Sequence, residues 1–391
     1  MSKVIYFDNS ATTKISEAAL KKYNDVSLEN YGNPSSLHAF GFDAEKEIKE
    51  AKKIVAVSLM EKDATVIFTA SGTEANNLAI TGRAYAKERY RSAAKIITTN
   101  SEHASVSEPI KKLADDGFKT AYIPTKEGKV DLNELEKELS KDVVLVSVML
   151  VNNETGAIYD IKRISDIVKA KCKGALIHVD ATQAYMKLPF TMRSLGADMV
   201  TVSSHKIHGP KGIGALIISP AVIKERGLAP IIYGGGQEGG LRSGTENVPG
   251  IAAFAVAVNE GKANLIKNFE KIESLRSYII QKIKEMPELS EIRITNPEKH
   301  APHIVNITLP SIKSETMLHY LSSRNILVSS GSACSSNTTH HHSHALVAYG
   351  MSEDDADSSI RISLSHENTK EEADELIVAL CDGIDRLARK K

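Results

Sequence analysis

The sequence contains no tryptophan, and aromatic residues make up only 5% of its 391 residues. Proteins that bind single-stranded nucleic acid usually stack bases on aromatic side chains, so this class of function is disfavoured. Lysine plus arginine and aspartate plus glutamate each number 49, which gives a formal net charge of zero. A chain without excess positive charge gives no sign of binding nucleic acid or an anionic membrane surface.

Long apolar runs are also absent, and none approaches the ~20 residues that a transmembrane helix requires. The longest apolar candidates are 143–151, interrupted by Ser147, and 251–258. The N-terminal segment MSKVIYFDNSATT has neither the apolar core of a secretory signal nor the arginine-rich pattern of a transit peptide. We therefore expect a cytoplasmic protein that does not contact membranes.

Cysteine occurs only three times, which is too few and too widely spaced for a disulfide framework or a Cys-x-x-Cys metal site. Cys172 lies at the end of an expected helix. Cys381 adjoins the apolar stripe of a C-terminal helix that a capping box from Thr369 to Glu372 would open. Both are predicted to be structural thiols. Cys334 differs, because the surrounding SSGSACSS is typical of a loop in which a thiol can be exposed and reactive.

The middle of the chain alternates expected strands and helices. Strands are expected at 66–70, 95–99, 143–151, 175–180, 199–203 and 214–218, and helices at 74–90, 103–114, after Asp131 and at 161–171. The strands are nearly all apolar, which is typical of strands that helices cover on both faces. This alternation predicts an α/β fold with a mostly parallel central sheet.

After about residue 264 the pattern changes to a long helix at 265–286, followed by strands at 292–295, 304–309, 326–329 and 360–364. Further helices are expected between and after these strands, so the segment predicts a smaller α+β domain. The length of the chain suits two or three domains, at about 150 residues each. We place a large domain at 16–264, and a small domain at 1–15 together with 265–391.

Five short segments follow expected strands or open expected helices, which is where ligands gather in open α/β sheets. The first, SGTE at 71–74, offers the Thr73 hydroxyl, close backbone approach at Gly72 and a helix N-terminus, a combination that suits a phosphate. The second contains His103, whose imidazole can stack on an aromatic cofactor and transfer protons near neutral pH. Taken alone, each segment also fits an ordinary helix cap or a surface position.

The other segments carry charged side chains next to apolar strands. Asp180, with Gln183 nearby, needs a cationic partner such as a protonated pyridine nitrogen, unless it is simply a helix cap. Lys206, in SSHKIHGPKG, can form a Schiff base or be a solvated loop lysine. The last segment pairs the Cys334 loop with Arg361, which would bind a substrate carboxylate or an internal acidic side chain. The Gly-x-x-x-x-Gly-Lys-Ser/Thr spacing of a nucleotide-binding loop is missing from the lysine segment.

In this order on one sheet, these features make up a pyridoxal 5′-phosphate (PLP) site. They supply a phosphate cradle, a histidine to stack on the ring, a carboxylate for the ring nitrogen and a lysine for the Schiff base. A reactive thiol at Cys334 and a carboxylate-binding group at Arg361 would complete an enzyme that processes an amino acid.

The sequence resembles the group I cysteine desulfurases (NifS/IscS type), which belong to the class V aminotransferase superfamily of PLP fold type I. The resemblance runs through almost the whole chain, in FDNSATT (7–13), GNPSSLH (32–38), SGTEANN (71–77), VNNE (151–154), 203–214, GGGQE (234–238), RSGT (242–245) and 329–334. It implies a homodimer that converts L-cysteine to L-alanine and places the sulfur on Cys334 as a persulfide. An acceptor protein, such as an iron–sulfur scaffold or a thiolation protein, would then take the sulfur.

The resemblance also implies a role for each matching residue. Lys206 would bind PLP covalently, Asp180 would pair with the pyridinium nitrogen, and Gln183 would bond the phenolic oxygen. His103 would stack on the ring and assist proton transfers. The phosphate would be held by Gly72, Thr73, Ser203 and His205, with Thr245 reaching the phosphate of the other subunit, and the substrate would be held by Asn33, Asn153 and Arg361.

Other functions are compatible with the same residues. A selenocysteine lyase, an aminotransferase or a kynureninase-like enzyme could use the same PLP site, although the last two need no thiol nucleophile and the Cys334 loop argues against them. An inactive sulfur carrier would have no use for both Lys206 and Asp180, and a nucleotide-binding enzyme lacks its motif. Neither the sulfur acceptor nor a preference for cysteine over selenocysteine follows from these residues.

The segment after Cys334 departs from the family pattern in a histidine-rich run, TTHHHSH at 338–344. We expect a solvated, variable loop here, and metal binding beside the reactive thiol is the alternative. Zinc titration of the metal-free protein should therefore match that of a variant in which all four histidines of the run are replaced by alanine. Zinc binding by the wild type above the level of that variant would contradict the loop and favour a metal site.

Overall fold

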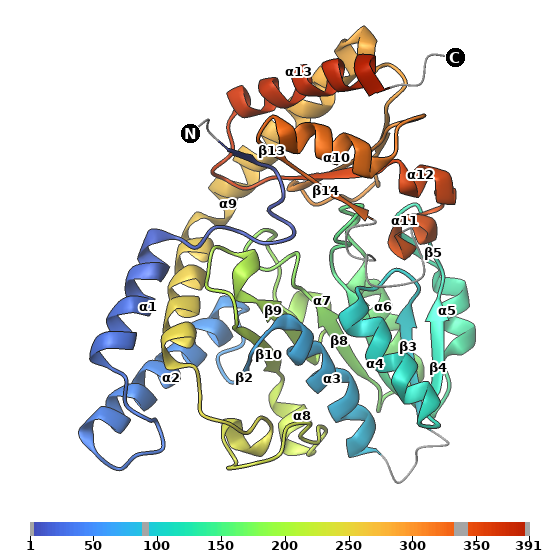
Figure 1. Ribbon diagram of the computed structural model, residues 1–391. Coiled ribbons are helices and arrows are strands. Elements are labelled where there is room, and N and C mark those ends of the chain that lie inside the picture. Colours follow the sequence, from blue (N-terminus) through green and yellow to red (C-terminus); the bar gives the residue numbers. More distant parts are fainter. Residues whose placement is uncertain (1–3, 88–93, 332–342, 388–391) are drawn as a thin grey trace.

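The computed structural model describes residues 4–87, 94–331 and 343–387 (Figure 1). Its centre is a seven-stranded sheet in the order β2-β10-β9-β8-β7-β3-β4. Of its strands, β10 alone runs in the opposite direction to the others, so the expected mostly parallel sheet is confirmed. The strands are β2 (Thr65–Thr69), β3 (Lys95–Thr99), β4 (Lys119–Ile123), β7 (Val143–Met149), β8 (Leu176–Asp180), β9 (Met199–Ser203) and β10 (Gly214–Ile218).

Helices cover both faces of this sheet, because successive side chains of each apolar strand point to opposite sides. In β3, for example, Ile96 packs with α3 and α4, whereas Ile97 joins the core formed with α2, α6 and α9. The helices are α1 (Glu17–Glu29), α2 (Ala39–Ser58), α3 (Gly72–Ala86), α4 (Ala104–Asp115), α5 (Leu132–Glu138), α6 (Ile161–Lys171), α7 (Met192–Leu195), α8 (Pro220–Lys224) and α9 (Val248–Glu285).

A second, antiparallel sheet has the order β11-β12-β15-β14 and its own apolar core. The N-terminal β1 (Ile5–Tyr6) pairs with β13 (Ile326–Leu327) beside it, and Ile5 and Phe7 are buried in that core. The expected α+β arrangement is therefore confirmed. Its remaining elements are β11 (Arg293–Thr295), β12 (Ile304–Thr308), β14 (Ser329–Ser330), β15 (Ser359–Ser363), α10 (Ser314–Ser323), α11 (His344–Tyr349), α12 (Glu353–Asp357) and α13 (Lys370–Leu387), and β5 (Thr125–Lys126) and β6 (Lys129–Val130) form a separate hairpin.

The helix expected at 265–286 is wrong at its start. The observed α9 begins at Val248 and runs for 38 residues, from the core of the large sheet into the core of the small one (Figure 1). Its first part, 251–258, is a continuous apolar run buried on most sides, so it lacks the helical periodicity by which a half-exposed helix is recognised. The residues at which the two expected domains meet thus lie inside one continuous helix.

Local signals for the cysteines and helix caps agree with the structure. Cys172 is buried at the C-terminus of α6, and its thiol donates to the carbonyl oxygen of Ser140 at 3.0 Å. Cys381 lies half-buried in α13, which the reciprocal bonds between Thr369 and Glu372 open. Cys334 lies outside the described residues. In the part of the chain that the structure describes, no helix is long and apolar enough to cross a membrane.

Gly214 begins β10 and packs against the turn that opens α3. A Cβ atom at this position would lie 2.6 Å from the carbonyl carbon of Ser71 and 2.8 Å from the amide nitrogen of Gly72. Gly214→Ala should therefore destabilise the fold by about 1–3 kcal/mol, because the backbone of that turn would have to move. Urea unfolding measures the change, and Gly174→Ala is the control, since a Cβ there would meet nothing within 4 Å. Equal stability of the two variants would show that the turn yields freely.

Candidate functional site

One cavity of about 350 Å³ opens at the carboxyl ends of the parallel strands, where the sequence predicted a ligand site. It is enclosed by segments from both sheets, since Ser329 and Arg361 of the small sheet line it opposite the strand ends of the large sheet. The predicted residues that it brings together are Gly72, Thr73, His103, Asn153, Asp180, Gln183, Ser203, His205, Lys206 and Arg361.

The N-terminus of α3 forms one wall and fits a phosphate group. Ser71 caps the helix by accepting a hydrogen bond from the Glu74 amide, and Gly72 follows it directly. A Cβ on Gly72 would come within 3.3 Å of both Ser203 and Thr182, so glycine keeps this corner open. The buried hydroxyl of Ser203 has no hydrogen-bond partner among the described residues. An unused hydroxyl beside a helix N-terminus is the donor set that a phosphate requires.

Asp180 ends β8 and is 6% exposed. Its two carboxylate oxygens accept hydrogen bonds from the side-chain amide of Asn76 at 2.8 Å and the backbone amide of Thr182 at 2.9 Å. Both donors are neutral, so they orient the carboxylate without neutralising its charge. A protonated ring nitrogen in the cavity would provide the missing positive charge.

Lys206 lies in a single 3₁₀ turn, Ser204–Lys206, that follows β9. Its ammonium group donates to the carbonyl oxygens of Ser10 at 2.6 Å and Ala11 at 2.7 Å. Gln183 donates to the same Ser10 carbonyl at 2.9 Å. The N-terminal segment thus holds two of the predicted cofactor residues in place, a function that its sequence, taken alone, did not reveal.

Arg361, in β15, is 3% exposed and forms the internal ion pairs that sequence analysis left open as an alternative. Its guanidinium lies 3.1 Å from Glu154 and 3.2 Å from Asp8, and it donates to the Asn153 carbonyl at 2.9 Å. Burial raises the pKa values of both carboxyl groups, while the positive charge of Arg361 lowers them. The arginine still lines the cavity, so these carboxylates fix its position beside the ligand space.

Two histidines of the cavity are held in their neutral form. Desolvation lowers the pKa of His103, and the charges of Lys206 and Arg361 lower it further against the opposing effect of Asp180. Burial lowers the pKa of His205 to about 4, with a contribution from the charge of Lys206. Both side chains can therefore act as neutral hydrogen-bonding groups toward an anionic ligand.

Two predicted residues lie elsewhere. Thr245 lines a separate cavity together with Glu238 and Arg242. Asn33 is exposed in the loop between α1 and α2, where its side-chain oxygen accepts from the Ser35 amide. Neither belongs to the cavity around Lys206, so their predicted roles stay predictions, as does that of Cys334.

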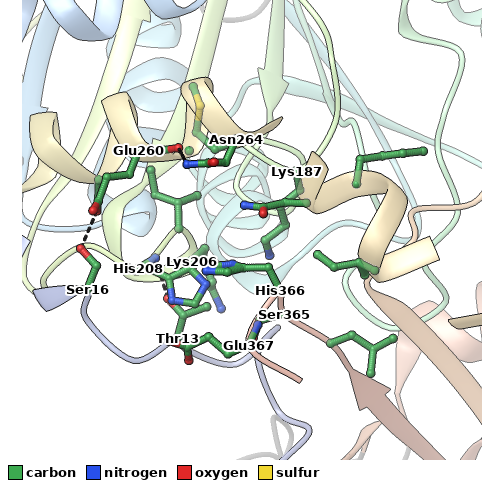
Figure 2. A pocket seen from close by; sticks show the side chains of 18 residues that line it. Thr13, Ser16, Lys187, Lys206, His208, Glu260, Asn264, Ser365, His366 and Glu367 are labelled. Atoms are coloured by element: carbon green, nitrogen blue, oxygen red, sulfur yellow. Dashed lines mark hydrogen bonds between the residues drawn. The ribbon is translucent and has the colours of Figure 1, made fainter. Parts of the chain in front are cut away.

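Lys206 also lines a second cavity, of about 160 Å³, shown in Figure 2. The side chains of Lys187 and His208 line this space. The ring of His366, which also lines it, packs edge-on against His208 with ring centroids 4.7 Å apart. Lys187 donates to the side-chain oxygen of Gln183 at 3.3 Å, and burial lowers its pKa to about 7. No sequence pattern marks this lysine, because its neighbourhood exists only in the folded chain.

Comparison with known proteins places the fold and the cavity in a family. The model of the class-V aminotransferase family matches residues 5–376. The chain belongs to this family. A class-V relative, "Cysteine desulfurase IscS 1" from Archaeoglobus fulgidus, is 38% identical over 98% of this chain and 97% of its own length. The match confirms the expected PLP fold type I and the dependence on PLP.

Two solved structures superpose on more than nine tenths of the chain. A "NIFS-like protein" has a TM-score of 0.90 and 36% identity, and the match covers 98% of this chain and all of the other. The structure titled "SspA in complex with cysteine" has a TM-score of 0.78 and 31% identity, with 93% of this chain and all of the other covered.

Glu102, which precedes His103, gives the stability of the fold a pH dependence that can be measured. Desolvation raises its pKa to about 8, although it accepts hydrogen bonds from Thr99 and from the Met149 amide. The folded state thus holds a proton that the unfolded state releases near pH 4.5, so stability falls as the pH rises toward 8. Glu102→Gln removes this titration, so between pH 5.5 and pH 8 the free energy of unfolding of the wild type should fall by about 2–3 kcal/mol more than that of the variant, measured by urea unfolding. A pH-independent difference between the two proteins would rule out the protonated carboxyl group.

Proposed function

We propose that this chain is a cysteine desulfurase that converts L-cysteine to L-alanine in the cavity around Lys206 and passes the sulfur to Cys334. The observation that carries the proposal is the meeting in one cavity of an amine, Lys206, a buried carboxylate, Asp180, and a fixed guanidinium, Arg361. These are the groups that a PLP enzyme needs for its Schiff base, its ring nitrogen and the carboxylate of an amino acid. A cysteine desulfurase relative aligned over almost the full length supports the choice of reaction.

Different residues of the cavity bind different parts of the cofactor. The α3 N-terminus with Gly72 and Thr73, together with Ser203 and His205, takes the phosphate. Asp180 pairs with the ring nitrogen, and Lys206 forms the covalent link. Gln183 bonds the phenolic oxygen. When bound, PLP supplies an electron sink that stabilises negative charge on the substrate carbon from which a proton is removed.

The remaining steps belong to side chains of this protein. Arg361 and Asn153 bind the substrate carboxylate, which places the α-carbon within reach of Lys206. The substrate amine would replace Lys206 in the covalent link, which frees the Lys206 amine to remove the α-proton. The Cys334 thiolate then attacks the substrate sulfur, so an S–S bond forms while the C–S bond breaks and its electron pair stays with carbon. That carbon is protonated, alanine leaves, and a persulfide remains on Cys334.

The wider organisation follows from the same assignment. The persulfide sulfur passes to an acceptor protein, either an iron–sulfur scaffold or a thiolation protein. Thr245 lies away from the Lys206 cavity, which supports a homodimer in which it reaches the phosphate of the other subunit. The separate apolar cores, one of which contains Ile5 and Phe7, support a large domain at 16–264 and a small domain at 1–15 and 265–391. We place the enzyme in the cytoplasm, as the sequence predicts.

The decisive experiment compares the wild type with Cys334→Ala. Both proteins should be yellow and lose their visible band on borohydride treatment, because Lys206 and the cofactor residues are unchanged. The wild type should release alanine and sulfide from L-cysteine in the presence of a reductant, and the variant should lose at least about 100-fold in rate, since it lacks the nucleophile. Full activity of a yellow variant would instead indicate a lyase that needs no thiol acceptor.

A further inference from the structure

Asn76 links two groups of the cavity through a single side-chain amide. It lies on α3, is 1% exposed, and donates both of its hydrogens. One goes to Asp180 at 2.8 Å and the other to the Ser105 hydroxyl at 2.8 Å. A carboxylate can only accept, so the amide nitrogen, rather than its oxygen, must face Asp180. This orientation commits the second hydrogen to Ser105.

Ser105 connects the Asn76 amide to the imidazole of His103. The imidazole caps α4, and its Nδ1 atom accepts a hydrogen bond from the backbone amide of Ser105 at 3.1 Å. A backbone amide can only donate, so Nδ1 carries no proton. The Ser105 hydroxyl lies 2.8 Å from the same Nδ1 and already accepts from Asn76, which leaves its own hydrogen to point at the imidazole. The proton of neutral His103 must then be on Nε2.

The charges around His103 favour this neutral form. Lys206 and Arg361 lower its pKa together with desolvation, and Asp180 acts in the opposite direction. Glu102 adjoins it in sequence, and its own raised pKa keeps that carboxyl group uncharged near neutral pH. The positive end of the α4 dipole also disfavours an imidazolium at the helix N-terminus.

We propose that Asn76 is a positioning residue for two catalytic groups at once: it orients the Asp180 carboxylate and, through Ser105, holds His103 in the tautomer protonated on Nε2. The inference rests on the proposed function, in which Asp180 pairs with the PLP ring nitrogen, and on the role that the family resemblance implies for His103, which is to stack on the ring and assist proton transfers. It assigns His103 a role, because Nε2 is then the ring nitrogen that can donate to a ligand in the cavity that His103 lines, and it cannot act as a base in the resting enzyme. None of the described residues bonds to Nε2, so that donor is available to a ligand.

Nitrogen-15 NMR of the histidine-labelled holoenzyme tests the tautomer directly, with His103 assigned by the loss of its signals in His103→Gln. The wild type should show a protonated Nε2. Ser105→Ala removes the hydroxyl bond but keeps the backbone one, so the fraction protonated on Nδ1 should rise about five-fold, while the pH dependence of the visible PLP band stays unchanged. Asn76→Leu should change both readouts, since it also removes a donor from Asp180.

Asn77→Leu is the matched control, because Asn77 is the next residue of the same helix and, among the described residues, its side-chain amide bonds only to the Thr73 carbonyl. It should alter neither the tautomer nor the visible band. A wild-type His103 protonated on Nδ1, or Asn76→Leu and Ser105→Ala spectra that match the control, would overturn the proposal. The tautomer is measured without turnover, so a fixed tautomer in a protein inactive on cysteine would reject the proposed function and leave the role of Asn76 standing.

Discussion

The buried guanidinium of Arg361 joins three parts of the chain that are distant in sequence. From the small sheet it forms ion pairs with Asp8 of the N-terminal segment and with Glu154, which lies in the loop between β7 and α6 of the large domain. Removing one partner of such a pair leaves an uncompensated buried charge, which costs about 3–5 kcal/mol. The two sheets can enclose a polar cavity because this arginine satisfies carboxylates on the opposite side while presenting its own charge to the ligand space.

The electrostatics of the cavity follow from that arrangement. Lys206 and Arg361 bring positive charge to a space that also contains the carboxylate of Asp180, and desolvation lowers the pKa values of His103 and His205, which favours their neutral forms. An amino acid and a phosphorylated cofactor bring mainly negative charge. The protein thus holds its cations in fixed positions before any ligand arrives, which reduces the reorganisation that binding requires.

Sequence reasoning succeeded where a local pattern had a local cause. The strands 95–99, 199–203 and 214–218 are found at their expected bounds because short runs rich in apolar and β-branched residues, flanked by turns, favour a strand. The polar residues after these strands meet because the carboxyl ends of parallel strands share one edge. Patterns could not reveal Asn76, since its partners lie 29 and 104 residues away, and they misplaced the start of α9 because an apolar run has no exposed face to mark it.

The continuous α9 has a mechanical consequence. At 1.5 Å per residue its 38 residues extend for about 57 Å, and the helix is anchored in both apolar cores. A loop between the cores would let them rotate about a hinge, whereas a helix resists bending along its whole length. The α9 helix therefore limits how far the two cores can move apart. Widening the cavity between them requires α9 to bend along its length rather than the chain to rotate about a few backbone torsions.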